Sequence, residues 1–209
     1  MRRLRVALAK GRLYDPSVER FRRAGAGLDG DPGRRLLLPS SDPGIEFLVV
    51  KPADVPVYVE AGAADLGVTG TDVLRETGAD VLEPLELGFG RCRLVVAAPA
   101  DRSYPSLPGG VTPRVATKYP NLTRQHFRAR GRPVDIVHVG GSVEVAPLLN
   151  LSHWIVDLVD TGNTLKANGL VERETILEVQ AVVVANRASQ KLNLDRYLDL
   201  MRRLGDAAP

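Results

Sequence analysis

Short runs of apolar residues recur along the chain, and stretches with helical spacing separate most of them. A short apolar run bounded by turn residues is typical of a buried strand, whereas an apolar residue every three or four positions indicates a helix. The runs predict strands at residues 4–9, 36–38, 45–50, 65–69, 94–98, 134–139, 154–159, 170–177 and 181–185. The stretches between them predict helices at 15–24, 54–61, 72–76, 120–130, 143–149, 165–168 and 194–204. Because strands and helices alternate throughout, the pattern indicates an α/β protein.

The alternation is interrupted once, by a polar and proline-rich passage from Asp101 to Pro113. Such a passage is typical of a crossing between two parts of a fold. The apolar run at 181–185 is suited to return the chain to the first part. We therefore expect two lobes, residues 1–98 with 181–209 and residues 99–180, joined by two crossing strands with a ligand cleft between them.

The composition narrows the class of protein. Of the 209 residues, 44% are hydrophobic and 25% are charged, which suffices for one large or two small domains. The net charge is only +3 and the arginine-rich runs contain no interleaved aromatic residues, so we expect no nucleic-acid binding. A single cysteine, Cys92, excludes an internal disulfide and any multi-cysteine metal site. No signal peptide or membrane-spanning stretch is recognisable, so we expect a cytoplasmic protein that does not enter membranes.

The segment from 154 to 170 combines a buried strand, a small polar turn and the start of a helix. The turn is Thr161-Gly162-Asn163-Thr164. The first N–H groups of a helix have no partners within it and face whatever lies in front, so such a turn can cradle an anion. Gly162 lets a ligand approach the backbone closely, and the hydroxyls of Thr161 and Thr164 add donors with little bulk.

A carboxylate precedes this turn. Asp157 interrupts the apolar run of the strand, at a place where it can accept hydrogen bonds from sugar hydroxyls. Donors for a phosphate beside an acceptor for a diol describe a site for a phosphorylated ribose. In the ordinary alternative, Thr164 caps the helix and Asp157 is a satisfied polar residue at a strand end. The four-residue turn alone does not decide between the two.

Two further turns join a predicted strand to a predicted helix. Lys10-Gly11-Arg12 follows the first strand, where ligand-binding groups gather in open α/β sheets. Gly70-Thr71-Asp72 follows the strand at 65–69 and offers a second site for an anion or a nucleobase, with Asp72 as cap or hydrogen-bond acceptor. Solvated surface charges and a tight turn, respectively, are the ordinary alternatives.

From residue 144 onward the chain reads EVAPLLNLSHWIVDLVDTGNTLKANGL, which closely resembles the signature of the ATP phosphoribosyltransferase family, the first enzyme of histidine biosynthesis. The residues that match at the family's spacing are Glu144, Ser152, Ile155, Asp157, Thr161, Gly162, Thr164 and Leu165. Three more blocks resemble the family in the same order, at residues 9–13, 54–59 and 67–72. The resemblance covers nearly the whole chain, and the combination is specific although no single block is.

The resemblance implies two lobes like those of type II periplasmic binding proteins, with ATP and phosphoribosyl pyrophosphate meeting in the cleft. The implied reaction transfers the phosphoribosyl group to N1 of the adenine of ATP and releases pyrophosphate. Lobe I, residues 1–98 and 181–209, would take the nucleotide or base, and lobe II, residues 99–180, would take phosphoribosyl pyrophosphate. Mg²⁺ is the implied cofactor, carried by the substrate phosphates rather than by a protein metal site, and it would neutralise the departing pyrophosphate.

The same resemblance assigns roles to residues. The Thr161–Thr164 turn would hold the 5′-phosphate, Asp157 the ribose hydroxyls, and Glu144 a ribose or the adenine amino group. Lys10 and Arg12 would bind phosphates and are the candidates for catalytic charge stabilisation. No general base is expected, since the attacking ring nitrogen already has a lone pair and positioning can suffice. The full set of expected substrate-binding residues is Lys10, Gly11, Arg12, Gly70, Thr71, Asp72, Glu144, Asp157, Asp160, Thr161, Gly162, Asn163 and Thr164.

Three positions depart from the family's usual residues. Asn150 stands in place of a glycine, and asparagine is the next best residue for a left-handed backbone. Ala9 replaces a common proline before Lys10, which should loosen that loop slightly. His138 occupies a strand position where lysine is frequent, so we assign it no phosphate role.

The chain stops after the predicted closing helix without an appended regulatory domain, as in the short form of the family. Short-form members need a second subunit similar to a histidyl-tRNA synthetase for full activity and for inhibition by histidine. We therefore expect a hetero-oligomer with such a partner and a homodimer without it.

Two other classes of protein compete with this interpretation. A different phosphoribosyltransferase would have paired acids before a Thr-Gly-x-Thr loop, but Val156 precedes Asp157 here and the N-terminal blocks would be unexplained. A non-catalytic protein of the same fold, such as a solute receptor or the effector domain of a regulator, is the second. A signal peptide or a DNA-binding helix pair usually accompanies such proteins, and neither is recognisable.

Overall fold

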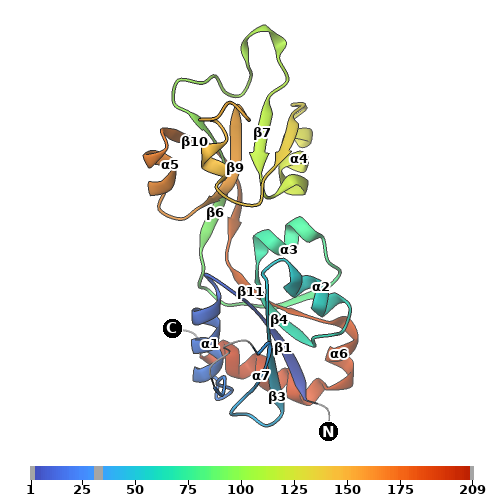
Figure 1. Ribbon diagram of the computed structural model, residues 1–209. Helices are drawn as coiled ribbons and strands as arrows, with labels where there is room; N and C mark the ends of the chain where they lie inside the picture. Colours follow the sequence, from blue (N-terminus) through green and yellow to red (C-terminus); the bar gives the residue numbers. More distant parts are fainter. Residues whose placement is uncertain (1–2, 31–34, 208–209) are drawn as a thin grey trace. The chain divides into compact units, whose positions relative to one another are not determined.

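The computed structural model describes residues 3–30 and 35–207, and its internal contacts divide the chain into two units (Figure 1). Residues 1–90 and 180–209 form the first unit, and residues 91–179 form the second. The first boundary therefore lies before the strand Cys92–Pro99 rather than after Ala98. The reason is that this strand pairs on both sides with strands of the second unit.

The first unit is built on a six-stranded mixed sheet. In sheet order the strands are β2 (Leu37–Pro39), β3 (Ile45–Val50), β1 (Leu4–Ala9), β4 (Leu66–Gly70), β11 (Ala181–Ala185) and β5 (Leu82–Glu86). Strand β1 pairs in parallel with β3 and β4, whereas β2, β11 and β5 run antiparallel to their neighbours. Three adjacent parallel strands thus end at one edge of this sheet, which is where open α/β sheets bind ligands.

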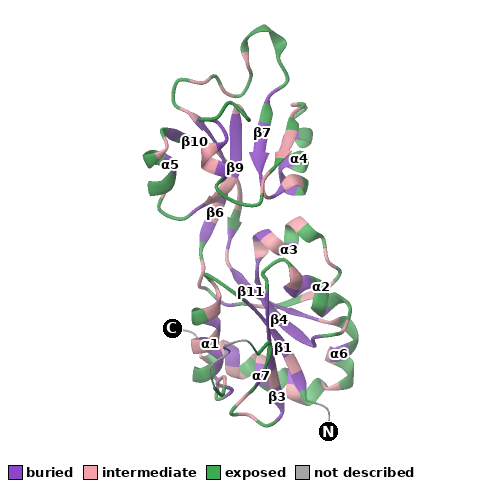
Figure 2. Ribbon diagram, in the orientation of Figure 1, coloured by how far each residue is buried: buried purple, intermediate pink, exposed green. Residues whose placement is uncertain are grey.

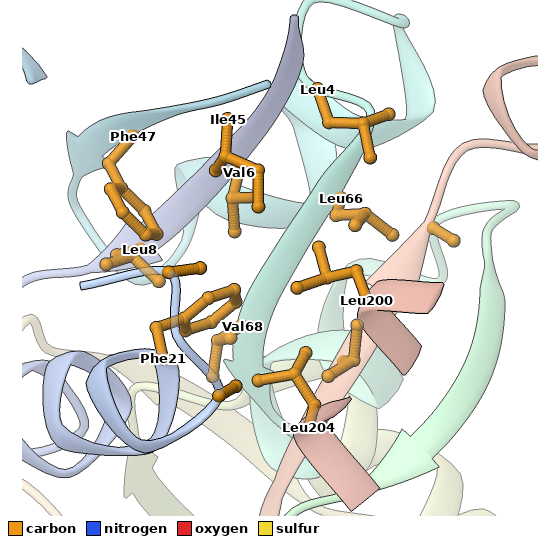
Figure 3. Close-up of a cluster of buried hydrophobic side chains, with 14 of the residues drawn as sticks. Leu4, Val6, Leu8, Phe21, Ile45, Phe47, Leu66, Val68, Leu200 and Leu204 are labelled. Carbon is orange, nitrogen blue, oxygen red and sulfur yellow. The ribbon is translucent and has the colours of Figure 1, made fainter. Parts of the chain in front are cut away.

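Helices cover both faces of this sheet. They are α1 (Tyr14–Arg23), α2 (Asp54–Glu60), α3 (Thr71–Thr77), α6 (Arg187–Leu192) and α7 (Leu194–Asp206). Because successive side chains of a strand point to opposite faces, β1 sends Leu8 toward α1 and α7 and Ala9 toward α2 and α3. Figure 3 shows the first of these cores, where Phe21 of α1 and Leu204 of α7 meet the strand side chains.

The second unit is built on a five-stranded sheet. In sheet order its strands are β10 (Leu170–Val179), β6 (Cys92–Pro99), β9 (Trp154–Val159), β7 (Arg114–Thr117) and β8 (Asp135–His138). Its helical segments are η1 (Pro108–Gly110), α4 (Pro120–Ala129), η2 (Val143–Val145) and α5 (Asn163–Ala167), where η denotes a 3₁₀ turn. Strands β9, β7 and β8 are parallel, and β9 lies in the middle of the sheet.

The two faces of β9 have different partners. On one face Trp154 packs parallel to Phe127 of α4, with 5.9 Å between the ring centroids. On the other face Ile155 joins a core with Val143 of η2 and Leu165 of α5. Figure 2 shows β9 buried along most of its length. Because successive side chains of β9 point to opposite faces, the strand has a purely structural face and a second face that η2 and α5 cover.

Most of the predicted elements are present, and the differences have local causes. The helix expected at 143–149 is wrong: only the turn η2 forms, because Pro147 has no N–H with which to continue the helix. Helix α1 begins at Tyr14, one residue before the expected start at residue 15, and Leu13 occupies its N-cap. The predicted elements do not include the strands β5 and β7 or the helix α6. Asn150 adopts the left-handed backbone expected of it, with a φ of 55°.

A charged cluster ties β10 to α4 and the loop that follows α4. The Glu174 carboxylate lies 3.0 Å from His126 Nε2, 3.1 Å from Arg130 Nε and 2.6 Å from Arg132 Nη1. Burial alone would raise the pKa of Glu174, but hydrogen bonds from Tyr104 and Arg132 and the arginine charge outweigh it and lower this pKa to about 2. Burial also lowers the pKa of His126, so the imidazole is neutral near pH 7.

The low pKa of Glu174 predicts a stability change in acid. Since the folded-state pKa of about 2 lies below the ordinary value of 4.5, the stabilisation is complete above pH 4.5 and is lost as the pH falls toward 2. We expect Glu174→Gln to lower the free energy of unfolding by about 2 kcal/mol near pH 6, with a smaller difference from wild type at about pH 3. Urea titration measures both values. Glu178→Gln, on the exposed part of the same strand, is the matched control, and a pH-independent difference would contradict the assignment.

Candidate functional site

The site in the second unit is built around Asp157 of β9. By the alternation of the strand, Asp157 shares a face with Ile155 and Val159, the face that η2 and α5 cover. Each covering segment is held by one buried apolar residue, Val143 for η2 and Leu165 for α5. These anchors fix the backbone next to the polar residues of the site.

A pocket of about 210 Å³ lies on this face. It is lined by Glu144, Asp157, Leu158, Val159, Asp160, Thr161, Gly162, Asn163, Thr164 and Leu165. All the site residues expected in this part of the chain therefore line one pocket, although Glu144 lies well before the others in sequence. The pocket thus combines three carboxylates, those of Glu144, Asp157 and Asp160, with the small polar turn.

Gly162 sets the shape of the turn. It occupies the N-cap position of α5 in the left-handed region, with a φ of 82°, which favours glycine. The backbone N–H of Asn163 donates to Thr161 Oγ1 at 3.5 Å, and the N–H of Lys166 donates to the Gly162 carbonyl at 3.1 Å. The alternative in which Thr164 caps the helix is wrong, because the cap position falls two residues earlier.

Asp157 Oδ1 makes two polar contacts, and one of them was not expected. Its Oδ1 accepts a hydrogen bond from the N–H of Leu158 at 2.8 Å and lies 3.3 Å from Lys118 Nζ. Lys118 directly follows β7, and Thr117 of β7 is paired in register with Val156 of β9. The sequence does not reveal that β7 and β9 are neighbours, so Lys118 could not be assigned to the site from its pattern.

Arg93 supports the turn from β6. Its Nη1 donates to the Asp160 carbonyl at 3.2 Å, while its Nη2 lies 2.7 Å from a carboxylate oxygen of Glu172. The hydrogen bonds from Arg93 lower the pKa of Glu172. Arg93 therefore links the end of β9 to β10 through an ionised pair, a support that the sequence analysis also missed.

In the first unit, the expected residues lie at the carboxyl edge of the parallel strands. Lys10 follows β1 and Gly70 ends β4, which are parallel neighbours. Lys51 follows β3, and the pairing of Ala9 with Val50 puts it beside Lys10 along this edge. Lys51 was not among the expected residues, because the sequence does not show that β3 and β1 are neighbours.

The Lys10-Gly11-Arg12 turn has the backbone that its glycine predicts. Gly11 is left-handed with a φ of 90°, and its carbonyl accepts the N–H of Tyr14 at 2.9 Å as α1 begins. Lys10 and Arg12 are exposed, and Arg12 Nη2 donates to the Gly90 carbonyl at 3.2 Å. The turn thus presents two cations at the end of a buried strand.

The turn at residues 70–72 places a buried carboxylate at the start of α3. Asp72 is only 5% exposed, and a Cβ added to Gly70 would overlap its Oδ1. Thr71 Oγ1 accepts the N–H of Gln180 at 3.3 Å, and the Thr71 N–H donates to the Gln180 carbonyl at 3.0 Å. The glycine is needed here to make room for the carboxylate rather than for a left-handed backbone.

Two negative observations concern the described part of the chain. Within residues 3–30 and 35–207, no group of three or more His, Cys, Asp or Glu side chains is arranged to hold a metal ion. In the same residues, no helix combines the length and apolar character that crossing a membrane would need.

Comparison with solved structures defines the class of fold. The periplasmic aliphatic sulphonate binding protein SsuA from Escherichia coli superposes with a TM-score of 0.61, covering 99% of this chain and 72% of that one, at 12% identity. At this identity the likeness concerns the fold alone. The chain therefore has the two-lobed α/β fold of periplasmic binding proteins, as the sequence led us to expect.

Closer relatives identify the family. Residues 51–206 match the family model HisG, ATP phosphoribosyltransferase. The ATP phosphoribosyltransferase of Sorangium cellulosum is 49% identical, covering 96% of this chain and 94% of the relative, and that of Halorhodospira halophila is 47% identical, covering 99% and 96%. A chain of the ATP phosphoribosyl transferase (HisG:HisZ) complex from Thermotoga maritima matches with a TM-score of 0.87 at 33% identity, covering 98% of each chain. The chain belongs to the ATP phosphoribosyltransferase family.

Proposed function

We propose that this chain is the catalytic subunit of an ATP phosphoribosyltransferase. It transfers the phosphoribosyl group of phosphoribosyl pyrophosphate to N1 of the adenine of ATP and releases pyrophosphate, the first step of histidine biosynthesis. The observation that carries the proposal is the pocket of the second unit that brings together Glu144, Asp157 and the 160–164 turn. Family membership, with relatives matched over almost their whole length, supports the reaction.

In this proposal the second unit binds the activated sugar. The backbone N–H groups at the start of α5 and the hydroxyls of Thr161 and Thr164 hold the 5′-phosphate. Asp157 accepts hydrogen bonds from the ribose hydroxyls, and Glu144 contacts a ribose or the adenine amino group. Asp160 lines the same pocket, and its carbonyl is held by Arg93.

The chemical step needs little more than positioning. The lone pair of adenine N1 forms a bond to C1 of the ribose while the bond from C1 to the pyrophosphate oxygen breaks and leaves its electron pair on that oxygen. No side chain has to remove a proton before the attack. Alignment of the substrates and stabilisation of the developing charge therefore suffice to accelerate the reaction. Lys10 and Arg12, with Lys51 beside them, are the cations we assign to the substrate phosphates. Asp72 and its turn are assigned to the base.

Mg²⁺ enters this proposal as part of the substrate. We propose that the ion travels with the phosphates of phosphoribosyl pyrophosphate rather than in a site built from protein carboxylates. When bound there, it offsets the charge that develops on the pyrophosphate.

We further propose a regulatory partner. The solved neighbour with a TM-score of 0.87 is part of a HisG:HisZ complex, which supports a HisZ-like subunit similar to a histidyl-tRNA synthetase. With it, the chain forms a hetero-oligomer that histidine inhibits, and without it a homodimer. An elution volume in gel filtration that corresponds to a lone 22.6 kDa chain would contradict the dimer. A cytoplasmic location follows from the two substrates.

A turnover assay tests the function directly. We expect pyrophosphate release when the chain is mixed with Mg²⁺, ATP and phosphoribosyl pyrophosphate, and faster release when a HisZ-like subunit is added. Controls without ATP, or with adenine or orotate in place of ATP, should release no pyrophosphate. Binding of phosphoribosyl pyrophosphate without turnover, with the partner present, would indicate a receptor, and turnover with another base would indicate a different transferase.

A further inference from the structure

Lys118 lies next to the sugar-binding carboxylate but outside the residues expected from the sequence. We infer that Lys118 is a positioning residue for the activated sugar, which orients the Asp157 carboxylate and offsets its charge while making no contact with the sugar phosphate itself. The inference deepens the proposed function, since it rests on Asp157 as the acceptor for the ribose hydroxyls.

The contacts of Asp157 show how its side chain is held. Lys118 Nζ lies 3.3 Å from Oδ1, the same oxygen that accepts the Leu158 N–H at 2.8 Å. Two donors on one carboxylate oxygen restrict the side-chain rotamer, and in the proposal the other oxygen, Oδ2, accepts hydrogen bonds from sugar hydroxyls. The carboxylate is thus arranged before the ligand arrives.

Lys118 is itself held in place. It follows β7, whose Thr117 is in register with Val156 of the parallel strand β9, so the lysine backbone lies beside that of Asp157. Its ammonium also lies 5.5 Å from the ring centroid of Tyr119, a buried residue whose N–H donates to Thr117 Oγ1 at 2.9 Å. A cation over an aromatic face is attracted to it, so the lysine stem has a defined direction.

The position of Lys118 indicates that it acts through Asp157. The pocket is lined by residue 144 and residues 157–165, and Lys118 is outside that set. The lining includes the carboxylates of Glu144, Asp157 and Asp160 but no lysine or arginine. An anionic sugar phosphate entering this pocket meets like charges, and an ammonium 3.3 Å from one of them reduces the repulsion.

A double-mutant cycle distinguishes positioning from direct phosphate contact. The dissociation constant of phosphoribosyl pyrophosphate with Mg²⁺ is measured by calorimetry for wild type, Lys118→Gln, Asp157→Asn and the double variant. We expect Lys118→Gln to weaken binding about three- to fivefold, the range of a partly exposed ion pair. We expect the double variant to bind as Asp157→Asn does, because the lysine has no role without the carboxylate.

Kinetics and matched variants complete the test. Lys118→Gln should raise KM for phosphoribosyl pyrophosphate and leave kcat at saturation close to wild type, and Lys118→Arg should restore most of the affinity. Lys166→Gln removes an exposed lysine of α5 that is also outside the pocket lining, and it should have little effect. Thermal unfolding checks that each variant is folded.

Each outcome decides one question. If the effects of Lys118→Gln and Asp157→Asn on the dissociation constant are additive, the inference is overturned in favour of direct contact between Lys118 and the phosphate. If Lys118→Gln and Lys166→Gln weaken binding equally, it is overturned in favour of a nonspecific effect of losing one positive charge. Wild-type affinity in Lys118→Gln, in a protein that turns over ATP, would overturn the inference and leave the proposed function intact. If the wild-type chain, assayed with its partner subunit, neither binds nor uses phosphoribosyl pyrophosphate, both the inference and the proposed function are overturned.

Discussion

Replacement of Gly162 by valine is expected to weaken the binding of phosphoribosyl pyrophosphate roughly ten- to a hundredfold, the effect of losing one or more hydrogen bonds to a charged phosphate. Gly162 has a φ of 82°, a conformation that a β-branched residue adopts only with strain. The valine side chain would also occupy a pocket of only about 210 Å³. Isothermal calorimetry with the Mg²⁺ complex measures the loss.

Gly169→Val is the matched control for strain. Gly169 has a similar φ of 67°, and a Cβ added there would meet open space. Gly169 lies just after α5 and does not line the pocket. We therefore expect a comparable loss of stability from the two substitutions and a loss of affinity from Gly162→Val alone. Equal affinities for the two variants would show that the turn does not hold the phosphate.

The polar turn and its helix could be predicted because all their determinants are local. The strand at 154–159, Gly162 and the helical residues after it are adjacent in sequence, and the structure reproduces each of them. Glu144 is more distant, and only the family resemblance linked it to Asp157. The structure supplies the physical link, since Val143 and Ile155 belong to one buried cluster.

Lys118 and Lys51 could not be assigned because their roles depend on sheet order. Each follows a strand directly, but a strand's neighbours are fixed by long-range pairing rather than by local pattern. The missed strand β5 has a different cause. Its residues, Leu82–Glu86, alternate charged and apolar side chains around a proline at the edge of the sheet, where no apolar run is needed.

Replacement of Gly70 by alanine tests the proposed nucleotide site of the first unit through steric overlap alone. Its φ of −82° and ψ of 147° suit any residue, so alanine causes no backbone strain there. A Cβ at this position would overlap Oδ1 of Asp72, which is only 5% exposed and has little room to move. Because we assign Asp72 to the base of ATP, Gly70→Ala should raise KM for ATP roughly tenfold, the effect of one displaced hydrogen-bonding group.

Steady-state kinetics at saturating phosphoribosyl pyrophosphate measure this KM, and calorimetry should show unchanged binding of the sugar substrate. The matched control is Gly78→Ala at the other end of the same helix, where φ is 66° and an added Cβ meets open space. That variant carries backbone strain without touching Asp72, so it should lose stability and keep its KM for ATP. A normal KM in Gly70→Ala would separate Asp72 from the nucleotide, whereas a raised KM for both substrates would indicate that the turn supports the fold rather than one ligand.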